Sequence, residues 1–369
     1  MPDREKYAFD LPEELLAQEP PEARGGERSD ARLAVLDRRS GQVAHRVFTD
    51  IVDYMRCGDV LVVNNARFVP SLLSGVDADG RVVAVSFHSP RGDGTWQCLV
   101  APEAVCRPGA RLTLGPAGEA SGRLLEQTGP GRWRIALDPG DAATLYALAR
   151  PVYASYLRRD PVDPEYYQNT YASRPGAVGN PAAGRHFTSA LLDEVRERGV
   201  SVAEVTLFLA ARTRHEVGRT FRRLVAQGGV GDPAAEDRGD ATRGGADFDF
   251  PPAERYEITE AAADLINERR AGGGRILVVG TSALRTLETV TGADGRVPAA
   301  TGRTDLRITP GHQFRACDAF VTNLHDPGSS ELLLVAALTG RDFLIDTYRH
   351  ELVPRGYHFN YFGDSMLIV

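Results

Sequence analysis

Hydrophobic residues follow two spacings in the second half of the chain, and segments of the two kinds alternate. One helix is predicted after Thr188, which can cap it; it carries Leu191, Leu192 and Val195 and stops at Gly199. A second helix is predicted over 259–270, where it starts at Thr259 and is ended by the glycines at 272–274. Continuous apolar runs between and after them predict buried strands at 200–209, 275–279 and 319–323. Alternating helices and strands are typical of an α/β fold.

Residues 70–139 have a different pattern. Short β-rich runs alternate there with the glycine turns DADGR, RGDGT, RPGAR and TGPGR, which is typical of a small antiparallel barrel or sandwich. Because α/β patterns lie on both sides, we expect an all-β, barrel-like domain inserted into a discontinuous α/β domain of residues 1–69 and 140–369. Residues 228–249, rich in Gly, Ala, Asp and Arg, are predicted to form a mobile loop.

Composition narrows the class of protein. A chain of 369 residues has the length of about two domains. Its four cysteines form no CxxC pair, so we expect no metal site and a reducing, cytoplasmic setting. The longest apolar run, Leu332–Leu338, is too short to span a membrane. The net charge of -7 argues against nucleic-acid binding by bulk charge, although it allows a local basic site, and the oligomeric state stays open.

Polar residues cluster just after predicted strands, where open α/β folds collect ligands. Asn64, Asn65 and Arg67 follow the run DVLVVN, with an ordinary turn as the alternative. The sequence GTS then follows RILVV as a predicted loop before a helix from residue 283. On that helix Arg285 and Glu288 share a face, either at a ligand or as a surface ion pair.

Three further segments offer groups for chemistry. His325 follows the strand at 319–323 and precedes a proline, which suits an acid-base group in a fixed position. His186 follows Gly184, and small residues there let the backbone approach a ligand closely. The segment FNYFGDSM offers Asp364 and aromatic rings that can stack on a base. The alternatives are structural histidines and core aromatics.

Seven blocks together resemble one family in order and spacing, over nearly the whole chain. They are FDLPEELLAQEP, GDVLVVNNARFVP, YQNTYASRPGAVGNPAAGRHF, GVSVAEVTL, GGRILVVGTSALRTLE, PGHQFRACDAFVTNLHDPGSSELLLVAAL and FGDSMLIV. The chain is similar to the S-adenosylmethionine:tRNA ribosyltransferase-isomerases of queuosine synthesis. The resemblance implies a β-barrel inserted in an α/β domain.

The resemblance also implies a reaction and its partners. The ribosyl part of S-adenosylmethionine moves onto the aminomethyl group of a deazaguanine in tRNA and is rebuilt, while adenine and methionine leave. S-adenosylmethionine is then a substrate, and no separate cofactor is expected. The roles that this reaction suggests are acid-base chemistry for His186 and His325, carboxylate binding for Arg67 and Arg285, and orientation of a histidine or a ribose hydroxyl for Asp364. Contacts to the ribose and adenine are suggested for Asn64, Asn65, Thr281, Gln313 and Asn323.

The chain departs from the family pattern after VTL. The family usually has a histidine and a glycine-rich run there, whereas this chain has FLAARTR, which brings in Arg212 and Arg214. Added side chains and charges predict a narrower, more basic pocket, with an acceptor smaller or more acidic than a tRNA-borne base. In one alternative, the two arginines contact the RNA backbone from outside the pocket. For the whole protein, two further alternatives are an enzyme that cleaves S-adenosylmethionine without tRNA and a non-catalytic protein that binds nucleic acid or a nucleoside.

Overall fold

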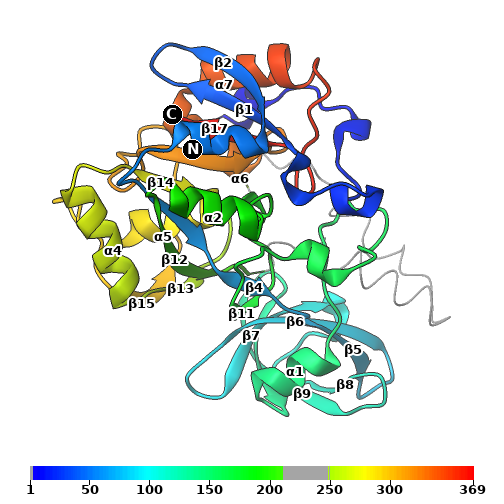
Figure 1. Cartoon of the computed structure of the whole chain (residues 1–369). Coiled ribbons are helices and arrows are strands. Elements are labelled where there is room, and N and C mark those ends of the chain that lie inside the picture. The colour runs from blue at the N-terminus through cyan, green and yellow to red at the C-terminus, as the bar shows by residue number, and fades with distance from the viewer. Residues whose placement is uncertain (1–2, 211–247, 249) are drawn as a thin grey trace.

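A mixed sheet of nine strands forms the larger part of the molecule. The computed structural model describes residues 3–210, 248 and 250–369. The strand order is β15-β13-β12-β3-β14-β16-β17-β1-β2 (Figure 1). The strands are β1 (Arg32–Asp37), β2 (Gln42–Val47), β3 (Val60–Asn64), β12 (Ser201–Phe208), β13 (Glu254–Ile258), β14 (Ile276–Val279), β15 (Ala300–Thr304), β16 (Ala319–Asn323) and β17 (Ser365–Ile368).

Four neighbouring strands of this sheet, β12, β3, β14 and β16, run parallel. Their carboxyl ends therefore meet at one edge of the sheet, the edge at which the sequence predicts a site. The last strand of the chain, β17, lies between β16 and β1, so the β1–β2 hairpin joins the sheet only through β17. The strands predicted at 200–209, 275–279 and 319–323 are confirmed as β12, β14 and β16.

Helices cover both faces of the sheet, because the buried strands carry apolar side chains on both faces. One face packs against α2 (Ser189–Glu197) and the 3-10 helix η5 (Phe48–Tyr54). The other packs against α4 (Glu260–Ala271), α5 (Gly280–Val290), α6 (Ser330–Thr339) and α7 (Arg341–Thr347). Thr188 and Thr259 accept hydrogen bonds from the first turns of α2 and α4, which confirms both predicted caps. No helix in the described part of the chain has the length and apolarity needed to cross a membrane.

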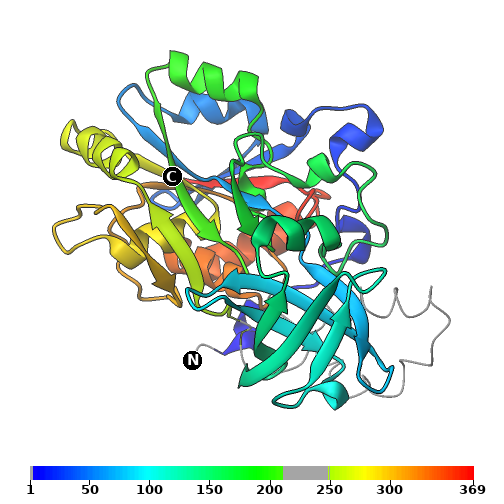
Figure 2. The ribbon, with the colours of Figure 1, turned by 90° about the horizontal axis from the view of Figure 1, so that it is seen from below.

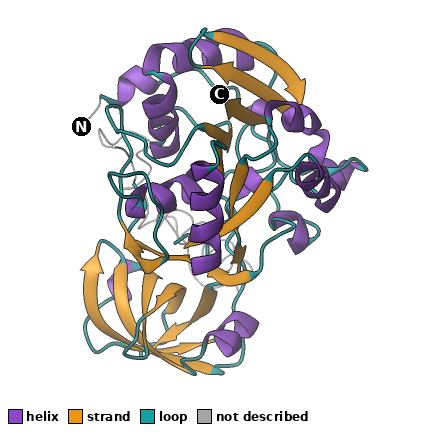
Figure 3. Ribbon diagram, turned by 60° about the vertical axis from the view of Figure 1, so that its left-hand side comes forward, coloured by secondary structure: helices purple, strands orange, loops and turns teal. Residues whose placement is uncertain are grey.

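A closed barrel of six antiparallel strands lies at one end of the molecule, with its own apolar core (Figures 1, 2 and 3). Its order is β10-β7-β6-β5-β8-β9. The strands are β5 (Leu72–Asp77), β6 (Val82–Pro90), β7 (Thr95–Ala101), β8 (Arg111–Leu114), β9 (Ala120–Gly129) and β10 (Arg132–Asp138), and the helix α1 (Ala142–Leu148) follows. Sheet strands precede and follow the barrel in the chain, so the predicted fold class, α/β with an inserted all-β barrel, is confirmed.

Short elements connect the two parts. β4 (Ala66–Phe68) enters the barrel and pairs in parallel with β11 (Arg174–Ala177), which lies on the return path. The other short elements are η1 (Arg4–Tyr7), η2 (Glu13–Leu15), η3 (Pro21–Arg24), η4 (Arg28–Asp30), η6 (Glu103–Val105), η7 (Pro164–Tyr167), η8 (Ala182–Gly184) and the π-helical turn η10 (Tyr348–Leu352).

One predicted boundary is wrong. The helix α5 begins at Gly280 and not at residue 283, so the GTS segment is its first turn and not a loop. Gly280 has a φ of 85°, and an added Cβ would lie 3.3 Å from the Cβ of Ala183. A glycine therefore lets the chain turn from strand into helix within one residue. The loop predicted at 228–249 lies, apart from Phe248, outside the described residues.

Candidate functional site

A cavity of about 310 Å³ opens at the carboxyl ends of β14 and β16. We call it the central pocket. Its walls come from four parts of the chain: the segment after α1, the segment 178–183 with the end of β12, the β14–α5 and β16–α6 connections, and the C-terminal segment. Its lining includes Tyr156, Tyr167, Asn180, Leu209, Ala210, Thr281, Ser282, Thr322, Asn323, His325, Asp326, Asn360 and Tyr361.

The first turn of α5 forms one wall of the central pocket. Val279, its N-cap residue, makes no side-chain cap, so the first N–H groups of the helix have no partner within it. Thr281 and Ser282 line the pocket, and the Ser282 hydroxyl is buried without a hydrogen-bond partner among the described residues. Free N–H groups and a free hydroxyl at a helix N-terminus suit an anionic or oxygen-rich ligand.

His325 lies on the opposite connection and lines the central pocket. The Thr322 hydroxyl lies 2.8 Å from its Nε2, and its backbone N–H donates to the Tyr348 hydroxyl at 3.2 Å. The sharp turn after β16 thus holds a half-buried imidazole in one orientation beside a hydroxyl that can exchange a proton with it. This is the arrangement of an oriented acid-base group.

Asn323 and Asn360 continue the same wall. The Asn323 amide donates to the Asn360 carbonyl at 3.2 Å, and the Asn360 amide donates to an Asp326 oxygen at 2.9 Å. Asn360 has a φ of 69°, the single positive φ of a non-glycine residue in the described part of the chain. Asparagine is among the few residues besides glycine that adopt this conformation readily, and here it turns the chain at the pocket wall. Sequence reasoning missed Asn360, because its backbone conformation leaves no pattern in the sequence.

Aromatic rings complete the pocket. Tyr156, Tyr167 and Tyr361 line it, and the rings of Tyr167 and Tyr361 are parallel, with centroids 3.9 Å apart. The Tyr156 hydroxyl accepts from the Tyr361 N–H at 2.9 Å, which ties the segment after the barrel to the C-terminal segment. These rings offer flat surfaces to a nucleobase. The FNYFGDSM segment therefore reaches the pocket through Asn360 and Tyr361.

Two of the three predicted catalytic residues do not line the central pocket. His186 is buried with its Nδ1 2.8 Å from the Arg28 carbonyl, and burial, with the nearby Arg185 charge, lowers its pKa to about 4. Asp364 accepts hydrogen bonds from the backbone N–H groups of Arg32 and His358 and pairs with the Arg32 guanidinium at 2.9 Å. Both side chains are bound within the protein, and neither lines the central pocket, so their catalytic roles stay predictions.

The polar groups after β3 are also engaged within the protein. Asn64 accepts from the Leu207 N–H at 3.0 Å and donates to the Leu207 carbonyl at 3.1 Å. Asn65 bridges the Glu204 carboxylate and the Thr206 hydroxyl, at 2.8 and 2.7 Å. These amides fasten β3 to β12, and each uses its carbonyl oxygen and one of its two N–H donors within the protein.

Arg67 and Gly184 likewise lie outside the pocket lining. Arg67 forms an ion pair with Glu165, so its charge is already matched by a carboxylate. Gly184 packs against Tyr171: an added Cβ would lie 1.5 Å from the Tyr171 hydroxyl oxygen. The close approach predicted at Gly184 is therefore real, but its partner is a core tyrosine and not a ligand.

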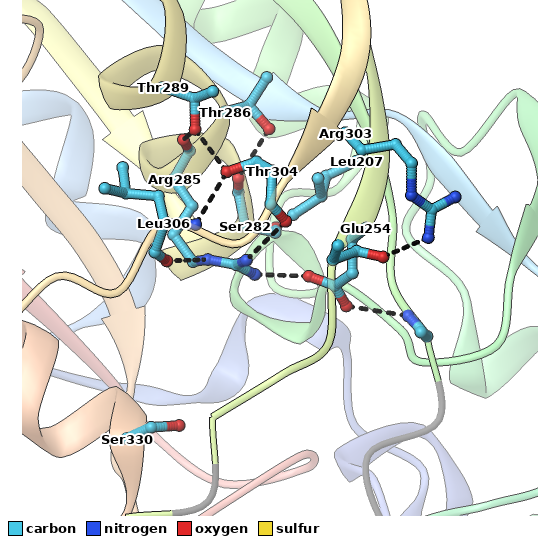
Figure 4. Close-up of polar contacts among 12 residues, drawn as sticks. Leu207, Glu254, Ser282, Arg285, Thr286, Thr289, Arg303, Thr304, Leu306 and Ser330 are labelled. Carbon is cyan, nitrogen blue, oxygen red and sulfur yellow. Dashed lines mark hydrogen bonds and ion pairs between the residues drawn. The ribbon is translucent and has the colours of Figure 1, made fainter. Parts of the chain in front are cut away.

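Arg285 and Glu288 share a helix but not an ion pair. Arg285 pairs with the buried Glu254, which also accepts from the Ala210 N–H at 2.9 Å (Figure 4). Glu288 accepts from the backbone N–H of Ala316 at 2.9 Å and lies 3.1 Å from the His312 Nε2. The alternative of a surface ion pair between them is wrong, because both side chains are buried and each has another partner. A ligand role for either side chain stays a prediction.

Gln313 is exposed, and its amide reaches only the Gly311 carbonyl, at 3.4 Å. Arg212 and Arg214 lie outside the described residues. Of the predicted site residues, Thr281, Asn323 and His325 come together in the central pocket. Arg285 lines a small adjoining cavity that shares Thr281 and Ser282 with it.

Three comparisons place this chain in a known group of proteins. A family model described as queuosine biosynthesis protein matches residues 4–222 and 249–368. The S-adenosylmethionine:tRNA ribosyltransferase-isomerase of Moorella thermoacetica is 37% identical, over 99% of this chain and 99% of its own. The enzyme of the same name from Symbiobacterium thermophilum is 35% identical, over 98% of each chain.

A solved structure agrees with these sequences. The crystal structure of an S-adenosylmethionine tRNA ribosyltransferase from Thermotoga maritima superposes with a TM-score of 0.53 and 29% identity, over 99% of this chain and 100% of that one. The likeness extends over the barrel and the α/β part together, and it confirms the resemblance of the seven sequence blocks. The chain therefore belongs to the family of queuosine biosynthesis proteins.

Proposed function

We propose that the protein transfers the ribosyl part of S-adenosylmethionine to 7-aminomethyl-7-deazaguanine in tRNA and isomerises it, which yields epoxyqueuosine and releases adenine and methionine. The observation that carries the proposal is the likeness, over nearly the full length, to proteins named S-adenosylmethionine:tRNA ribosyltransferase-isomerase. The central pocket supports it, because its position and its groups suit this chemistry.

S-adenosylmethionine binds in the central pocket in this proposal. A volume of about 310 Å³ lies at the lower end of the range of small-molecule sites. The tyrosines offer a stacking surface for a purine, and Asn180, Asn323 and Thr281 offer hydrogen-bond partners for its ring and for the ribose. These are the roles that the sequence assigned to Asn323 and Thr281.

The methionine carboxylate needs a positive partner, and the two predicted arginines are already paired with carboxylates. The first turn of α5 takes this role instead. Its free N–H groups carry the positive end of the helix dipole, and Ser282 adds a hydroxyl donor beside them. A carboxylate bound there keeps the sulfonium end of the substrate inside the pocket.

His325 is the group that moves protons in this proposal. The sulfonium acidifies the neighbouring 5′ carbon of the ribose, so a base in contact with that carbon can remove a proton. Adenine must gain a proton before it leaves, and an imidazole that has taken up one proton can supply one. Thr322 fixes the ring at its Nε2 during both steps.

A smaller or more acidic acceptor remains the second candidate. Leu209 and Ala210 line the central pocket at the point where the family pattern has a glycine-rich run. Side chains there reduce the space beside S-adenosylmethionine. The predicted contribution of Arg212 and Arg214 to this narrowing stays a prediction, because both lie outside the described residues.

One experiment separates the two candidates. The protein is incubated with S-adenosylmethionine, with and without tRNA that carries 7-aminomethyl-7-deazaguanine, and nucleosides and small products are identified by mass spectrometry. We expect epoxyqueuosine in the tRNA and equal amounts of adenine and methionine. Consumption of S-adenosylmethionine that is indifferent to the tRNA would contradict the proposal and favour a small acceptor. The matched control is tRNA with guanine at the same position.

A further inference from the structure

A second, wider cavity lies between the barrel and the edge of the sheet. Its volume is about 730 Å³, and it is lined by the β6–β7 turn, the end of β12, the edge strand β15 and its neighbour β13. We call it the arginine groove. Its lining residues are Pro90, Arg91, Gly92, Asp93, Phe208, Arg255, Tyr256, Glu257, Thr301, Gly302 and Arg303.

Three exposed arginines face this groove from three different strands or turns: Arg91 from the barrel, Arg255 from β13 and Arg303 from β15. Arg91 donates to the side-chain oxygen of Gln97 at 3.1 Å, and the Arg255 guanidinium lies 3.9 Å from the ring centre of Phe208. Arg303 donates to a backbone carbonyl (Figure 4). Within the described residues, none of the three forms an ion pair.

The carboxylates of the groove do not neutralise these arginines. Glu257 is bound by Arg174 at 2.6 Å, and Asp93 accepts from Thr95 at 2.6 Å and lies 3.3 Å from Arg134. The pKa of Arg303 is lowered by burial and then by the like charges of Arg91 and Arg255, so the guanidinium groups are close enough to repel one another. A bound polyanion relieves that repulsion and gives each guanidinium a partner.

The arginine groove and the central pocket are lined by residues that are neighbours in the chain. Phe208 lines the groove, and the next two residues, Leu209 and Ala210, line the pocket. A strand of nucleic acid held in the groove therefore lies next to one wall of the pocket. The net charge of the whole chain is -7, so the local concentration of arginines, and not bulk charge, provides this attraction.

We propose that the arginine groove binds the phosphate backbone of the RNA whose base is modified in the central pocket. The inference rests on the proposed function and adds the surface that holds the RNA. An open groove with guanidinium groups on both the barrel and the sheet fits successive phosphates of one strand better than one small anion. The barrel then serves as one side of an RNA clamp.

The test compares the parent protein with an Arg91→Gln, Arg303→Gln double variant in tRNA binding, measured by fluorescence anisotropy at several salt concentrations. The control is an Arg196→Gln, Arg341→Gln double variant, which loses the same charge from exposed sites on α2 and α7. We expect the groove variant to lose affinity at least tenfold and its log–log salt slope to flatten by roughly one unit per lost phosphate contact. The control should behave like the parent.

Turnover and small-ligand binding give the second readout. We expect the groove variant to raise the KM for tRNA at unchanged kcat, with unchanged binding of S-adenosylmethionine by calorimetry. Parent-like affinity, slope and KM in the groove variant would overturn the groove proposal alone and leave the proposed function standing. A parent protein that binds no tRNA would overturn both. Pyrophosphate binding that depends on Arg91 and Arg303, with tRNA affinity unchanged, would make the groove a small-anion site and also overturn the RNA proposal.

Discussion

At the scale of single residues, His325 and Thr322 carry the clearest catalytic expectation. We expect His325→Ala to lower kcat by about 10²–10⁴-fold, the usual contribution of an acid-base group. The ring is half-buried at a turn, so its removal should change the free energy of unfolding little. Single-turnover kinetics and urea denaturation measure the two effects separately.

Thr322→Val is the companion variant. It removes the hydroxyl 2.8 Å from the His325 Nε2 and keeps the shape of the side chain. A smaller loss of kcat with a shifted pH–rate profile is expected, because the imidazole stays but its hydrogen-bond partner changes. If His325→Ala melts early and keeps full activity when folded, the histidine is structural and the proposed role is wrong.

We expect His186 to affect the pH dependence of the free energy of unfolding and not the catalytic step. Burial lowers its pKa to about 4, whereas the unfolded chain has a histidine pKa of about 6.5. Between these two pH values, the His186 imidazole therefore binds a proton in the unfolded state and stays neutral in the folded state. The stability gained from the neutral ring is present above pH 6.5 and is lost as the pH falls towards 4.

His186→Asn keeps a donor for the Arg28 carbonyl and cannot titrate. Between pH 7 and pH 4, the free energy of unfolding should fall less in this variant than in the parent. We expect the two losses to differ by an amount on the order of 3 kcal/mol. Urea denaturation from pH 7 to pH 4 measures the difference. Part of the slope should remain, because burial lowers the pKa of His88 to about 3 in the same way. Identical slopes in parent and variant would contradict the account.

At the scale of elements, the Arg285–Glu254 pair joins α5 to β13 and also fixes the end of β12 through the Ala210 N–H. Both side chains are buried, so Arg285→Met leaves an unpaired carboxylate inside the protein. We expect a loss of about 3–5 kcal/mol in the free energy of unfolding. Chemical denaturation measures it.

Arg341→Ala is the matched control for this pair. Arg341 pairs with Asp342 at the surface, and such pairs contribute about 0–1 kcal/mol. If Arg285→Met loses binding of S-adenosylmethionine while its stability stays at the level of the control, Arg285 is a substrate ligand after all. The family resemblance suggested that role, and the pairing with Glu254, 31 residues away in the chain, leaves no local signal in the sequence.

Elements were predictable where the signal is local. The threonine caps and glycine stops of α2 and α4 lie within a few residues of the helices they bound. The start of α5 was not predictable in this way, since it depends on a positive φ at Gly280 and on close packing against Ala183. The residues of the central pocket were likewise predictable only where the signal is local. The pocket position of His325 follows from its place after β16, whereas the separation of His186 and Asp364 from the pocket depends on tertiary contacts.

At the scale of the whole molecule, the central pocket joins segments that are far apart in the chain. A ligand that contacts all of them stabilises the fold as a unit. We expect S-adenosylmethionine and S-adenosylhomocysteine to bind in calorimetry, and S-adenosylmethionine at a hundred times its Kd to raise the free energy of unfolding by about 2.7 kcal/mol. The control is Thr281→Phe, which puts a large side chain at the pocket wall and should abolish the effect. Absence of binding of either compound at millimolar concentration would contradict the prediction.

The place of β17 in the sheet has a consequence for how the chain is made. Residues 32–47 are synthesised early. The β1–β2 hairpin that they form has no neighbouring strand in the sheet until residues 365–368 have been synthesised. Until then β1 and β16 each have an edge without a hydrogen-bonded neighbour, and exposed edges favour pairing with other chains. Any nascent or truncated chain that lacks β17 is therefore the form of this protein most exposed to aggregation and most dependent on chaperones.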